Sequence, residues 1–445
     1  MCASFDNFGR VVRRERQAMP AELAMRDLLR GSATLPSLLA FGNGRSYGDS
    51  CHNDAGSLVQ MRPRKAICLF DPETGVIDAE AGTSLEEIVT HAAPFGYFLP
   101  VTPGTRFVTL GGAIANDVHG KNHHLRGTFG CHVESFELLR SDGVRYHCTP
   151  EENRELFAAT IGGLGLTGLI LSARLKLMRV GSLDIQERIT RFANLDGYFD
   201  LAEAADAENE YAVAWVDQLA SGSAAGRGVL ITGNHADNGN FRSGTKRARL
   251  GVPFDLPFSA LNRLSLTLFN SAYFRAKSRH RGTHLTDYGA FFYPLDGVKD
   301  WNKLYGPAGL YQHQSVIPFE AARSVIPDML TASRTAGHAS FLTVLKRFGA
   351  VRSPGLLSFP RPGYTLTMDF PNRGPRTLAL LETLDRMTVE AGGRMNPYKD
   401  QRMSAAAFRA GFSEWPQLEG LRDQNFCSDF WRRTALSDER AREMT

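Results

Sequence analysis

The sequence predicts an α+β protein with two domains, and three observations carry this prediction. A chain of 445 residues is too long for one compact core and has the length of two domains. Between residues 34 and 113, short apolar runs alternate with glycine and proline turns and lead into a helix-like segment, as is typical of α+β folds. After about Gly181 the chain changes character. We therefore expect a domain boundary between residues 180 and 181.

The first part contains short strands and one clearly marked helix start. The apolar runs LPSLLAFG, SLVQM, ICLF and GVIDAEAG predict strands. Ser84 followed by Glu87 has the pattern of a capping box and predicts a helix over 84–96. Residues 135–147 predict a hairpin that turns at Asp142-Gly143, and the alternating run 169–178 predicts a strand.

Beyond Gly181 we expect a domain of strands with helices on one face, which forms a lid over the ligand site. Strands are predicted over 211–217, 228–232, 289–293, 311–317, 340–348 and 364–370, and helices over 320–336 and 376–391.

Composition excludes several classes of protein. A net charge of +4 is too small to indicate a nucleic-acid partner. The six cysteines have neither CxxC nor zinc spacing, so we expect free thiols in a reducing, cytoplasmic compartment and no metal site. The sequence contains no run of about 18 apolar residues, so we expect no membrane span. The arginines near the amino terminus are not followed by an apolar segment, so we expect no secretory signal. These arginines are Arg10, Arg13, Arg14 and Arg16.

A glycine-rich stretch over residues 101–130, VTPGTRFVTLGGAIANDVHGKNHHLRGTFG, is the most informative part of the sequence. Glycine lets the backbone approach a ligand closely and direct successive N–H groups at it, which suits the diphosphate of a dinucleotide. A series of tight turns in a β-rich domain is the alternative for this stretch alone. Two further glycine turns, FGNGRSYGD at 41–49 and ELFAATIGGLGLTG at 155–168, support the ligand-binding interpretation.

The last of these motifs also satisfies the pattern GxGxxG through Gly163, Gly165 and Gly168. A dinucleotide-binding Rossmann motif follows a strand and opens a helix. Here a helix-like segment precedes the glycines and a predicted strand follows them. We therefore reject NAD as a tightly held cofactor.

The three motifs GRSYGD, PGTRFVTLGGAIANDVHGKNHH and IGGLGLTG closely resemble those of flavoprotein oxidases of the vanillyl-alcohol oxidase/p-cresol methylhydroxylase (PCMH) type. Within that family the chain is most similar to the oxidases of polyprenyl-phosphoryl ribose, and the resemblance covers essentially the whole chain. It implies a PCMH-type FAD-binding domain over 1–180, an antiparallel-sheet substrate domain over 181–392, and a return of 393–445 to the first domain.

The resemblance also implies which residues bind FAD. In many relatives a histidine at the position of Tyr47 bonds covalently to the flavin, so tyrosine here predicts non-covalent FAD. A covalent link through His119, His123 or Cys131 is less favoured. The implied cofactor-binding residues are Gly44, Arg45, Ser46, Tyr47, Gly48, Pro103, Gly104, Thr105, Thr109, Gly111, Gly112, Ala113, Asn116, His119, Gly120, Asn122, His123, Gly163, Gly168 and Ile170.

Lys399, in the motif YKDQR, is the first candidate for contact with the reacting hydroxyl. It matches the lysine that relatives place beside the isoalloxazine ring, and a lysine buried there can act as a base or hydrogen-bond partner. Without the resemblance, a solvated lysine beside Asp400 would be the better interpretation. Tyr47 and His119 complete the implied catalytic set, although His119 alone would be interpreted as a core histidine.

The resemblance implies substrate contacts by Lys121, Gln314, Lys346, Thr365, Thr367 and Lys399. Lys346 alternates with apolar neighbours in its predicted strand, so it can point inward at a phosphate. Mycobacterial relatives carry an asparagine and a cysteine at Thr365 and Thr367, and covalent inhibitors attack that cysteine. We expect this chain to be insensitive to such inhibitors. Whether its sugar binds in the same pose as in those relatives is left open by the two threonines.

The implied reaction is oxidation of the 2'-hydroxyl of a polyprenyl-phosphoryl-β-D-ribose to the 2'-keto sugar, by hydride transfer to flavin N5. A separate NAD(P)H-dependent short-chain reductase would then complete epimerisation to the arabinose lipid. One alternative is an aldonolactone or alditol oxidase that acts on a soluble sugar or polyol. Another is a binding protein that holds FAD only for structure.

Residues 250–274 are rich in leucine, phenylalanine and proline, with basic residues on both sides, so that the whole basic and apolar segment covers 246–281. Such a segment can contact anionic lipid headgroups at the inner membrane. A loop or helix packed on its own domain is the alternative.

Overall fold

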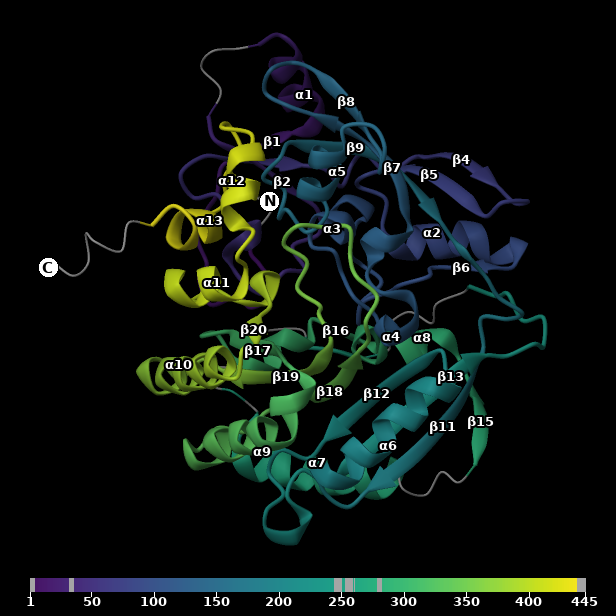
Figure 1. Ribbon diagram of the computed structural model, residues 1–445, viewed down its shortest axis with the longest axis vertical. Coiled ribbons are helices and arrows are strands. Elements are labelled where there is room, and N and C mark those ends of the chain that lie inside the picture. Colours follow the sequence, from purple (N-terminus) through teal and green to yellow (C-terminus); the bar gives the residue numbers. More distant parts are fainter. Residues whose placement is uncertain are drawn as a thin grey trace, which may run out of the picture.

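The computed structural model describes residues 5–31, 36–243, 250–252, 259, 261–277 and 282–437. Figure 1 shows two main sheets, one in the upper and one in the lower part of the molecule, with the yellow C-terminal helices beside the upper part. This arrangement is the mixed α+β architecture that the sequence predicts.

The upper part contains a five-stranded antiparallel sheet and a three-stranded parallel sheet. The five-stranded sheet has the order β4 (Ile67–Asp71), β5 (Val76–Glu80), β9 (Leu169–Lys176), β7 (Val133–Leu139) and β8 (Arg145–Cys148). The three-stranded sheet has the order β1 (Ala18–Pro20), β3 (Ser57–Gln60) and β2 (Leu38–Phe41). A short antiparallel pair joins β6 (Tyr97–Phe98) to β10 (Met178–Arg179). The predicted hairpin is therefore β7–β8.

Five helices accompany these strands: α1 (Ala21–Leu29), α2 (Leu85–Ala92), α3 (Leu110–Ala115), α4 (His123–Arg126) and α5 (Arg154–Thr160). Helix α2 begins at the predicted capping box, in which the Ser84 side chain accepts from the Glu87 N–H and the Glu87 carboxylate accepts from the Ser84 N–H. Helix α5 precedes the glycines 163–168 and β9 follows them, which is the reverse of a Rossmann unit.

The lower part is built on an eight-stranded antiparallel sheet. Its order is β15 (Thr283–Thr286), β11 (Ile185–Phe192), β13 (Gly228–His235), β12 (Tyr211–Val216), β18 (Thr343–Phe348), β19 (Gly363–Pro371), β17 (Leu310–Ile317) and β20 (Arg394–Met395). Because β20 lies two residues beyond position 392, the sheet crosses the predicted boundary there; the domain boundaries themselves stay a prediction.

One face of this sheet carries a core and the other faces the upper part. Leu345, Leu366 and Met368 pack in a core with helices α6 (Leu195–Glu208), α9 (Phe319–Thr335) and α10 (Pro375–Glu390). The alternate residues Val344, Lys346 and Thr367 line a cavity instead. Side chains of a strand point alternately to its two faces, so this division follows directly from the strand period.

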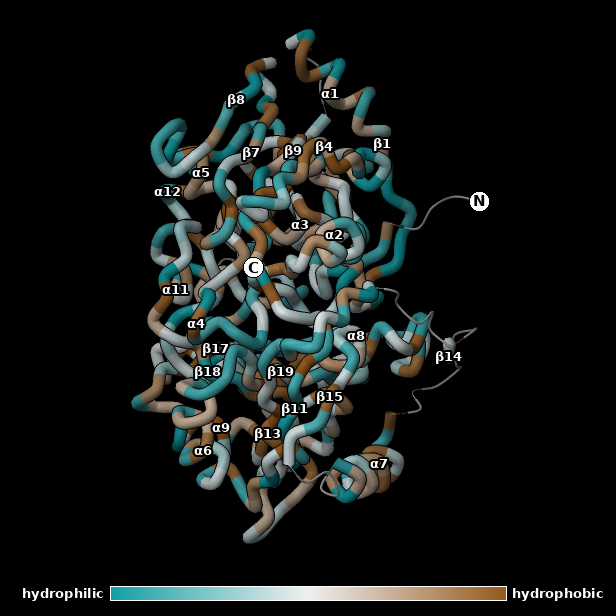
Figure 2. Tube along the Cα trace, turned by 90° about the vertical axis from the view of Figure 1, so that its right-hand side faces the viewer, coloured by the Kyte–Doolittle hydropathy of each residue, from teal (hydrophilic) through white to brown (hydrophobic). Residues whose placement is uncertain are grey.

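The remaining elements close the molecule. Helix α7 (Arg263–Lys277) lies at one edge, as Figure 2 shows, and helix α8 (Tyr288–Phe292) lies near the junction of the two parts. Strands β14 (Leu250–Gly251) and β16 (Val298–Lys299) form a short parallel pair. Helices α11 (Ala405–Gly411), α12 (Trp415–Leu421) and α13 (Asp429–Thr434) share a core with Leu164 and Leu166 of the third glycine turn.

Two expectations need correction or restriction. The strand predicted at 289–293 is wrong: these residues belong mainly to helix α8, because the Asp287 side chain caps it by accepting from the N–H groups of Gly289 and Ala290. Of the predicted lipid-contacting segment, residues 246–249, 253–258, 260 and 278–281 lie outside the described residues.

Candidate functional site

A cavity of about 940 Å³ lies where the upper part meets the eight-stranded sheet. Its wall takes residues from all three glycine turns, from the strands β12, β17, β18 and β19, and from the turn that ends at Lys399. The volume is at the upper end of the range for cofactor and ligand sites.

The three glycine turns meet in one place. Asn43 of the first turn donates to the carbonyl oxygen of Phe107 in the second at 2.7 Å, and a Cβ on Gly42 would lie 2.5 Å from Thr109 Oγ1. The third turn joins through the Leu164 N–H, which donates to the Ala115 carbonyl at 2.8 Å. Only a residue without a side chain fits at Gly42, which explains the glycine there.

Arg45 extends this backbone cradle with a cation. Its guanidinium lies over the rings of Phe107 and Phe8, at 5.2 and 5.8 Å from the ring centroids. Burial lowers its pKa, and its buried Nε has no hydrogen-bond partner among the residues that the structure describes. A buried guanidinium N–H requires an acceptor, and anionic oxygens are the acceptors that it binds most strongly. The cradle therefore fits the diphosphate of FAD.

Most of the predicted cofactor residues line the cavity. These are Gly44, Arg45, Ser46, Tyr47, Pro103, Gly104, Thr105, Thr109, Gly111, Gly112, Asn116, His119, Gly120, Gly168 and Ile170. The structure places the other five outside its wall: Gly48, Ala113, Asn122, His123 and Gly163.

These five residues support the wall from behind. A Cβ on Gly48 or Gly163 would collide with the backbone of Asp400 or Ala159. Ala113 is in the core, and Asn122 bonds to the Pro100 carbonyl and the Glu210 carboxylate. His123 packs against Phe348, and burial lowers its pKa to about 3.

Lys399 and Tyr47 face the cavity as a pair. The Lys399 ammonium lies 4.1 Å from the centroid of the Tyr47 ring. Burial lowers the pKa of Lys399, and the nearby carboxylate of Asp369 opposes this shift. Burial also disfavours the charged form of Asp369 and so raises the pKa of its carboxyl group. A lysine held in this way can reach its neutral form near neutral pH and accept a proton.

His119, Gln314 and Lys346 form a second polar group. The Gln314 amide donates to His119 Nε2 at 3.0 Å, and its own oxygen accepts from Asn396 at 2.9 Å. The ring proton of neutral His119 is then on Nδ1, which lies 3.3 Å from Lys346 Nζ. This geometry favours a neutral amine at Lys346, in agreement with a pKa that burial lowers to about 7.

The other predicted substrate residues lie nearby. The Lys121 amine donates to the Phe291 carbonyl and lies 4.3 Å from the centroid of the Phe291 ring. Burial lowers the pKa of Lys121 to about 8. Thr367 lines the cavity, whereas Thr365 is fully buried behind it and accepts from Gln314 at 3.2 Å.

One part of the cavity wall is apolar and aromatic. The ring centroids of Trp215 and Tyr273 of α7 are 4.7 Å apart, and those of Phe269 of α7 and Phe341 are 5.2 Å apart. Val213, Ile231 and Val344 complete this part of the wall. Asn270 fixes α7 over it by donating to Asp217 at 2.8 Å. We call this part the apolar arm.

Gln312 and Asp369 are among the site residues that sequence reasoning does not identify. Gln312 lines the cavity and donates to the fully buried Asp369. The only available signal was their alternation with Gln314 and Thr367 along β17 and β19, which pair in register. Alternation places residues on one face but does not distinguish a functional side chain from a structural one.

Comparison with known proteins gives the same class of site. Residues 33–149 match the model of an FAD binding domain. The chain is 35% identical to decaprenylphosphoryl-β-D-ribose oxidase of Mycolicibacterium smegmatis, over 90% of this chain and 89% of that protein. It is 33% identical to an uncharacterized protein of Streptomyces coelicolor over 79% of this chain and all of that one. A shorter match, 28% identical over 30% of each chain, is to mouse L-gulonolactone oxidase.

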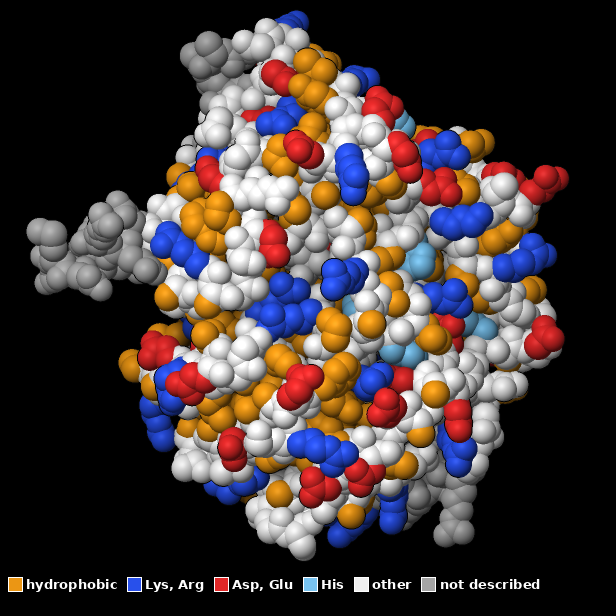
Figure 3. Space-filling view, viewed as in Figure 1, with side chains coloured by type: hydrophobic (Ala, Val, Ile, Leu, Met, Phe, Trp, Pro, Cys, Tyr) orange, Lys and Arg blue, Asp and Glu red, His pale blue; other side chains and the backbone are white. Residues whose placement is uncertain are grey.

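Surface properties add two observations. Figure 3 shows basic and acidic side chains interspersed on the face that it presents. Among the helices of the described residues, none has both the length and the apolar character needed to cross a membrane.

Proposed function

The chain belongs to the family of decaprenylphosphoryl-β-D-ribose oxidase and is an FAD-dependent oxidoreductase, and from this premise we propose its reaction. The proposed substrate is a polyprenyl-phosphoryl-β-D-ribose, whose 2'-hydroxyl is oxidised to the 2'-keto sugar. When bound, FAD supplies a hydride acceptor at N5. The glycine turns and Arg45 hold the cofactor.

The observation that carries the proposal is the composition of the cavity. One part of its wall holds Lys399, Lys346 and His119, and another part is the apolar arm beside α7. A soluble sugar or lactone needs only the polar part. A lipid-linked sugar needs both, with the apolar arm covering the first part of the lipid chain. This favours the polyprenyl-linked substrate over the soluble alternative.

Lys399 is proposed to hold the reacting hydroxyl and to take its proton. Loss of a proton from the hydroxyl must accompany loss of hydride from its carbon, so a neutral amine at that oxygen assists the reaction. Tyr47 restricts the position of the amine from one side. His119 and Gln314 bind each other and orient sugar hydroxyls without a change of charge, because burial keeps the pKa of His119 well below its usual range.

Lys346 is proposed to bind the phosphate of the substrate. Its amine lies on the cavity face of β18, 3.3 Å from Nδ1 of the neutral His119, and no carboxylate of the described residues forms an ion pair with it. An anionic phosphodiester favours the ammonium form of this amine. Phosphate binding therefore stabilises the charge that burial alone disfavours.

The product of this reaction is a ketone that remains attached to the lipid. Reduction of that ketone from the opposite face would give the arabinose epimer. The proposed partner is therefore a separate NAD(P)H-dependent short-chain reductase. We also propose that the segment 246–281 touches the membrane in which the substrate is anchored.

The experiment is anaerobic mixing of the purified flavoprotein with a polyprenyl-phosphoryl ribose while the visible flavin band is recorded. Ribose, ribose 5-phosphate and an aldonolactone serve as comparison substrates. We expect rapid bleaching with the lipid-linked ribose only. Equal bleaching with free sugars or lactones would favour the soluble-substrate alternative. Flavin that stays oxidised with every compound would favour a structural role of FAD.

A further inference from the structure

The turn that carries Tyr47 and the turn that carries Lys399 are in direct backbone contact. The Tyr47 N–H donates to the Tyr398 carbonyl at 3.0 Å. A Cβ on Gly48 would lie 1.3 Å from the carbonyl oxygen of Asp400. Each turn continues into an acidic residue, Asp49 or Asp400, and these are only 8% and 5% exposed. Two buried carboxylates therefore lie behind the Tyr47 and Lys399 pair.

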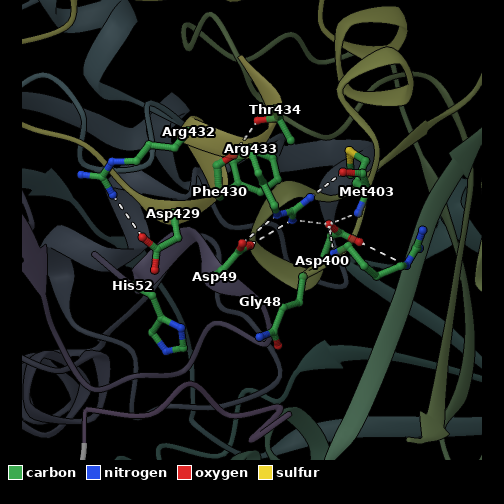
Figure 4. Close-up of polar contacts among 12 residues, drawn as sticks. Gly48, Asp49, His52, Asp400, Met403, Asp429, Phe430, Arg432, Arg433 and Thr434 are labelled. Atoms are coloured by element: carbon green, nitrogen blue, oxygen red, sulfur yellow. Dashed lines mark hydrogen bonds and ion pairs between the residues drawn. The ribbon is translucent and has the colours of Figure 1, made fainter. Parts of the chain in front are cut away.

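Arg433 of α13 binds both carboxylates, as Figure 4 shows. Its Nε and Nη2 donate to the two oxygens of Asp49 at 2.7 and 2.9 Å. Nη2 also donates to Asp400 at 2.7 Å, and Nη1 donates to the Met403 carbonyl. Burial alone would lower the pKa of Arg433, but Asp400 and Asp49 outweigh it and raise that pKa. The guanidinium fork thus connects three segments.

Asp400 is also held from its other side. Its carboxylate accepts from the N–H groups of Arg402 and Met403 at 2.8 and 2.6 Å, and the Arg402 guanidinium lies 3.5 Å away. Two arginines and two amides therefore compensate this charge. The carboxylate is directed toward them although it directly follows Lys399 in the chain.

We propose that Arg433 is a positioning residue, through which the C-terminal helix α13 sets the placement of Tyr47 and Lys399 at the flavin site. It does so in two ways. It ties Asp49, which follows the cofactor-binding turn 44–48, to the turn 397–400, and it engages Asp400 so that this carboxylate does not form an ion pair with Lys399. The inference rests on the proposed function only for its rate measurement.

The test compares Arg433→Met with Arg432→Met in the holoenzyme. Arg432 lies on the same helix but binds Asp429, Ser37 and Asn53. The first readout is the dissociation constant of FAD, followed by flavin fluorescence, and it needs no substrate. The second is the anaerobic rate constant of flavin reduction together with the substrate dissociation constant. Thermal unfolding is recorded for both variants.

For Arg433→Met we expect about tenfold weaker FAD binding and an about 10- to 100-fold slower reduction, because small misplacements of reacting groups are costly. Substrate affinity should change little. Arg432→Met should match the wild type in both readouts, even at an equal loss of thermal stability. If folded Arg433→Met also matches the wild type in both, the proposal is overturned.

If Arg433→Met does not fold, Asp49→Asn is used in its place. The amide has the same shape as the carboxylate, and Arg433 remains paired with Asp400, so this variant should fold. We expect several-fold changes in the same direction, and unchanged FAD binding and rate would contradict the proposal. If the wild-type protein is not reduced by the lipid-linked ribose, the proposed function fails, and FAD affinity still decides the role of Arg433.

Discussion

At the scale of single residues, the proposed chemistry depends on amines whose pKa burial lowers. Lys399, Lys346 and Lys121 all line one cavity, and burial lowers the pKa of each. The charges of Lys121 and Lys399 add to the effect of burial on Lys346, whose pKa is the lowest of the three, so Lys346 loses its proton most readily. Substrate charge and the reacting proton can then determine which amine is protonated.

Lys399→Met should retain FAD but lower the rate constant of anaerobic flavin reduction by about 100-fold or more, the usual contribution of a proton-transferring group. Rapid mixing with the lipid-linked ribose measures this rate. Lys176→Met is the control, since this lysine is exposed, lies outside the cavity wall and donates to the Thr74 carbonyl. Undiminished bleaching by Lys399→Met would remove Lys399 from the mechanism.

Lys346 gives substrate binding a pH dependence of predictable sign. Its pKa is about 7 in the protein without substrate, and a bound phosphodiester should raise it. Binding should therefore be tightest below pH 7 and weaken as pH rises above 7, by up to about tenfold per pH unit until the pKa of the complex is reached.

Equilibrium binding of the substrate between pH 6 and about 9 measures this slope. Lys346→Met should bind more weakly and lose the slope above pH 7, while Lys121, with a pKa near 8, contributes only at higher pH. A slope that persists unchanged in Lys346→Met would contradict the phosphate role.

The sequence predicted the residues of this site unevenly. Lys399, Lys346 and Gln314 were found by resemblance to a family, whereas composition and period alone would have treated each as ordinary. Gln312 and Asp369 were not found. They bind each other across 57 residues of the chain, and no local sequence pattern indicates such a pair.

At the scale of elements, the glycine turns and α3 form the cofactor cradle. Gly112 lies in α3 on the cavity wall, and its N–H bonds to the capping Thr109 at 3.2 Å. Gly112→Val should give folded but colourless protein, because the added side chain would occupy space beside the turns that fit the diphosphate. Flavin content per protein, from absorbance, is the measurement.

Gly420→Val is the matched control, since Gly420 is also helical and a Cβ there meets nothing within 4 Å. It should leave flavin content unchanged. Full flavin retention by Gly112→Val would count against this part of the cradle.

Helix α7 is the element best placed to contact lipid. Leu264 and Leu268 are 71% and 64% exposed, while the same helix covers the apolar arm through Phe269 and Tyr273. The double variant Leu264→Ser, Leu268→Ser should reduce sedimentation with anionic liposomes, because it removes apolar area from the proposed contact.

Leu285→Ser in β15 removes a comparably exposed leucine, at 58%, and should leave sedimentation unchanged. If the α7 double variant sediments like the wild type, the helix contacts only its own domain. The flavin content of both variants should equal that of the wild type.

Elements with a strong period were predictable and a short aromatic run was not. Strands β17 and β19 and helices α9 and α10 lie within one or two residues of their predicted bounds. The run GAFFY was misjudged because five apolar residues fit a buried strand or a helical turn equally well. The Asp287 side chain decides between them by capping α8.

At the scale of the whole molecule, the cavity is formed where the glycine turns of the upper part meet the eight-stranded sheet. The upper part supplies the glycine turns, and the eight-stranded sheet supplies Gln314, Lys346 and Thr367. The family resemblance predicted this division. The connection of α13 to both turns through Arg433 was not predictable, because its contacts span 384 and 33 residues of sequence.

We propose that three separate glycine turns form one cradle for non-covalently bound FAD. This cradle is best tested by an absorbance spectrum of the purified protein before and after acid precipitation. We expect a visible flavin band in the native protein and its complete transfer to the acid supernatant. A folded protein that shows no flavin band and cannot be reconstituted with FAD, or flavin that stays with the precipitate, would contradict it.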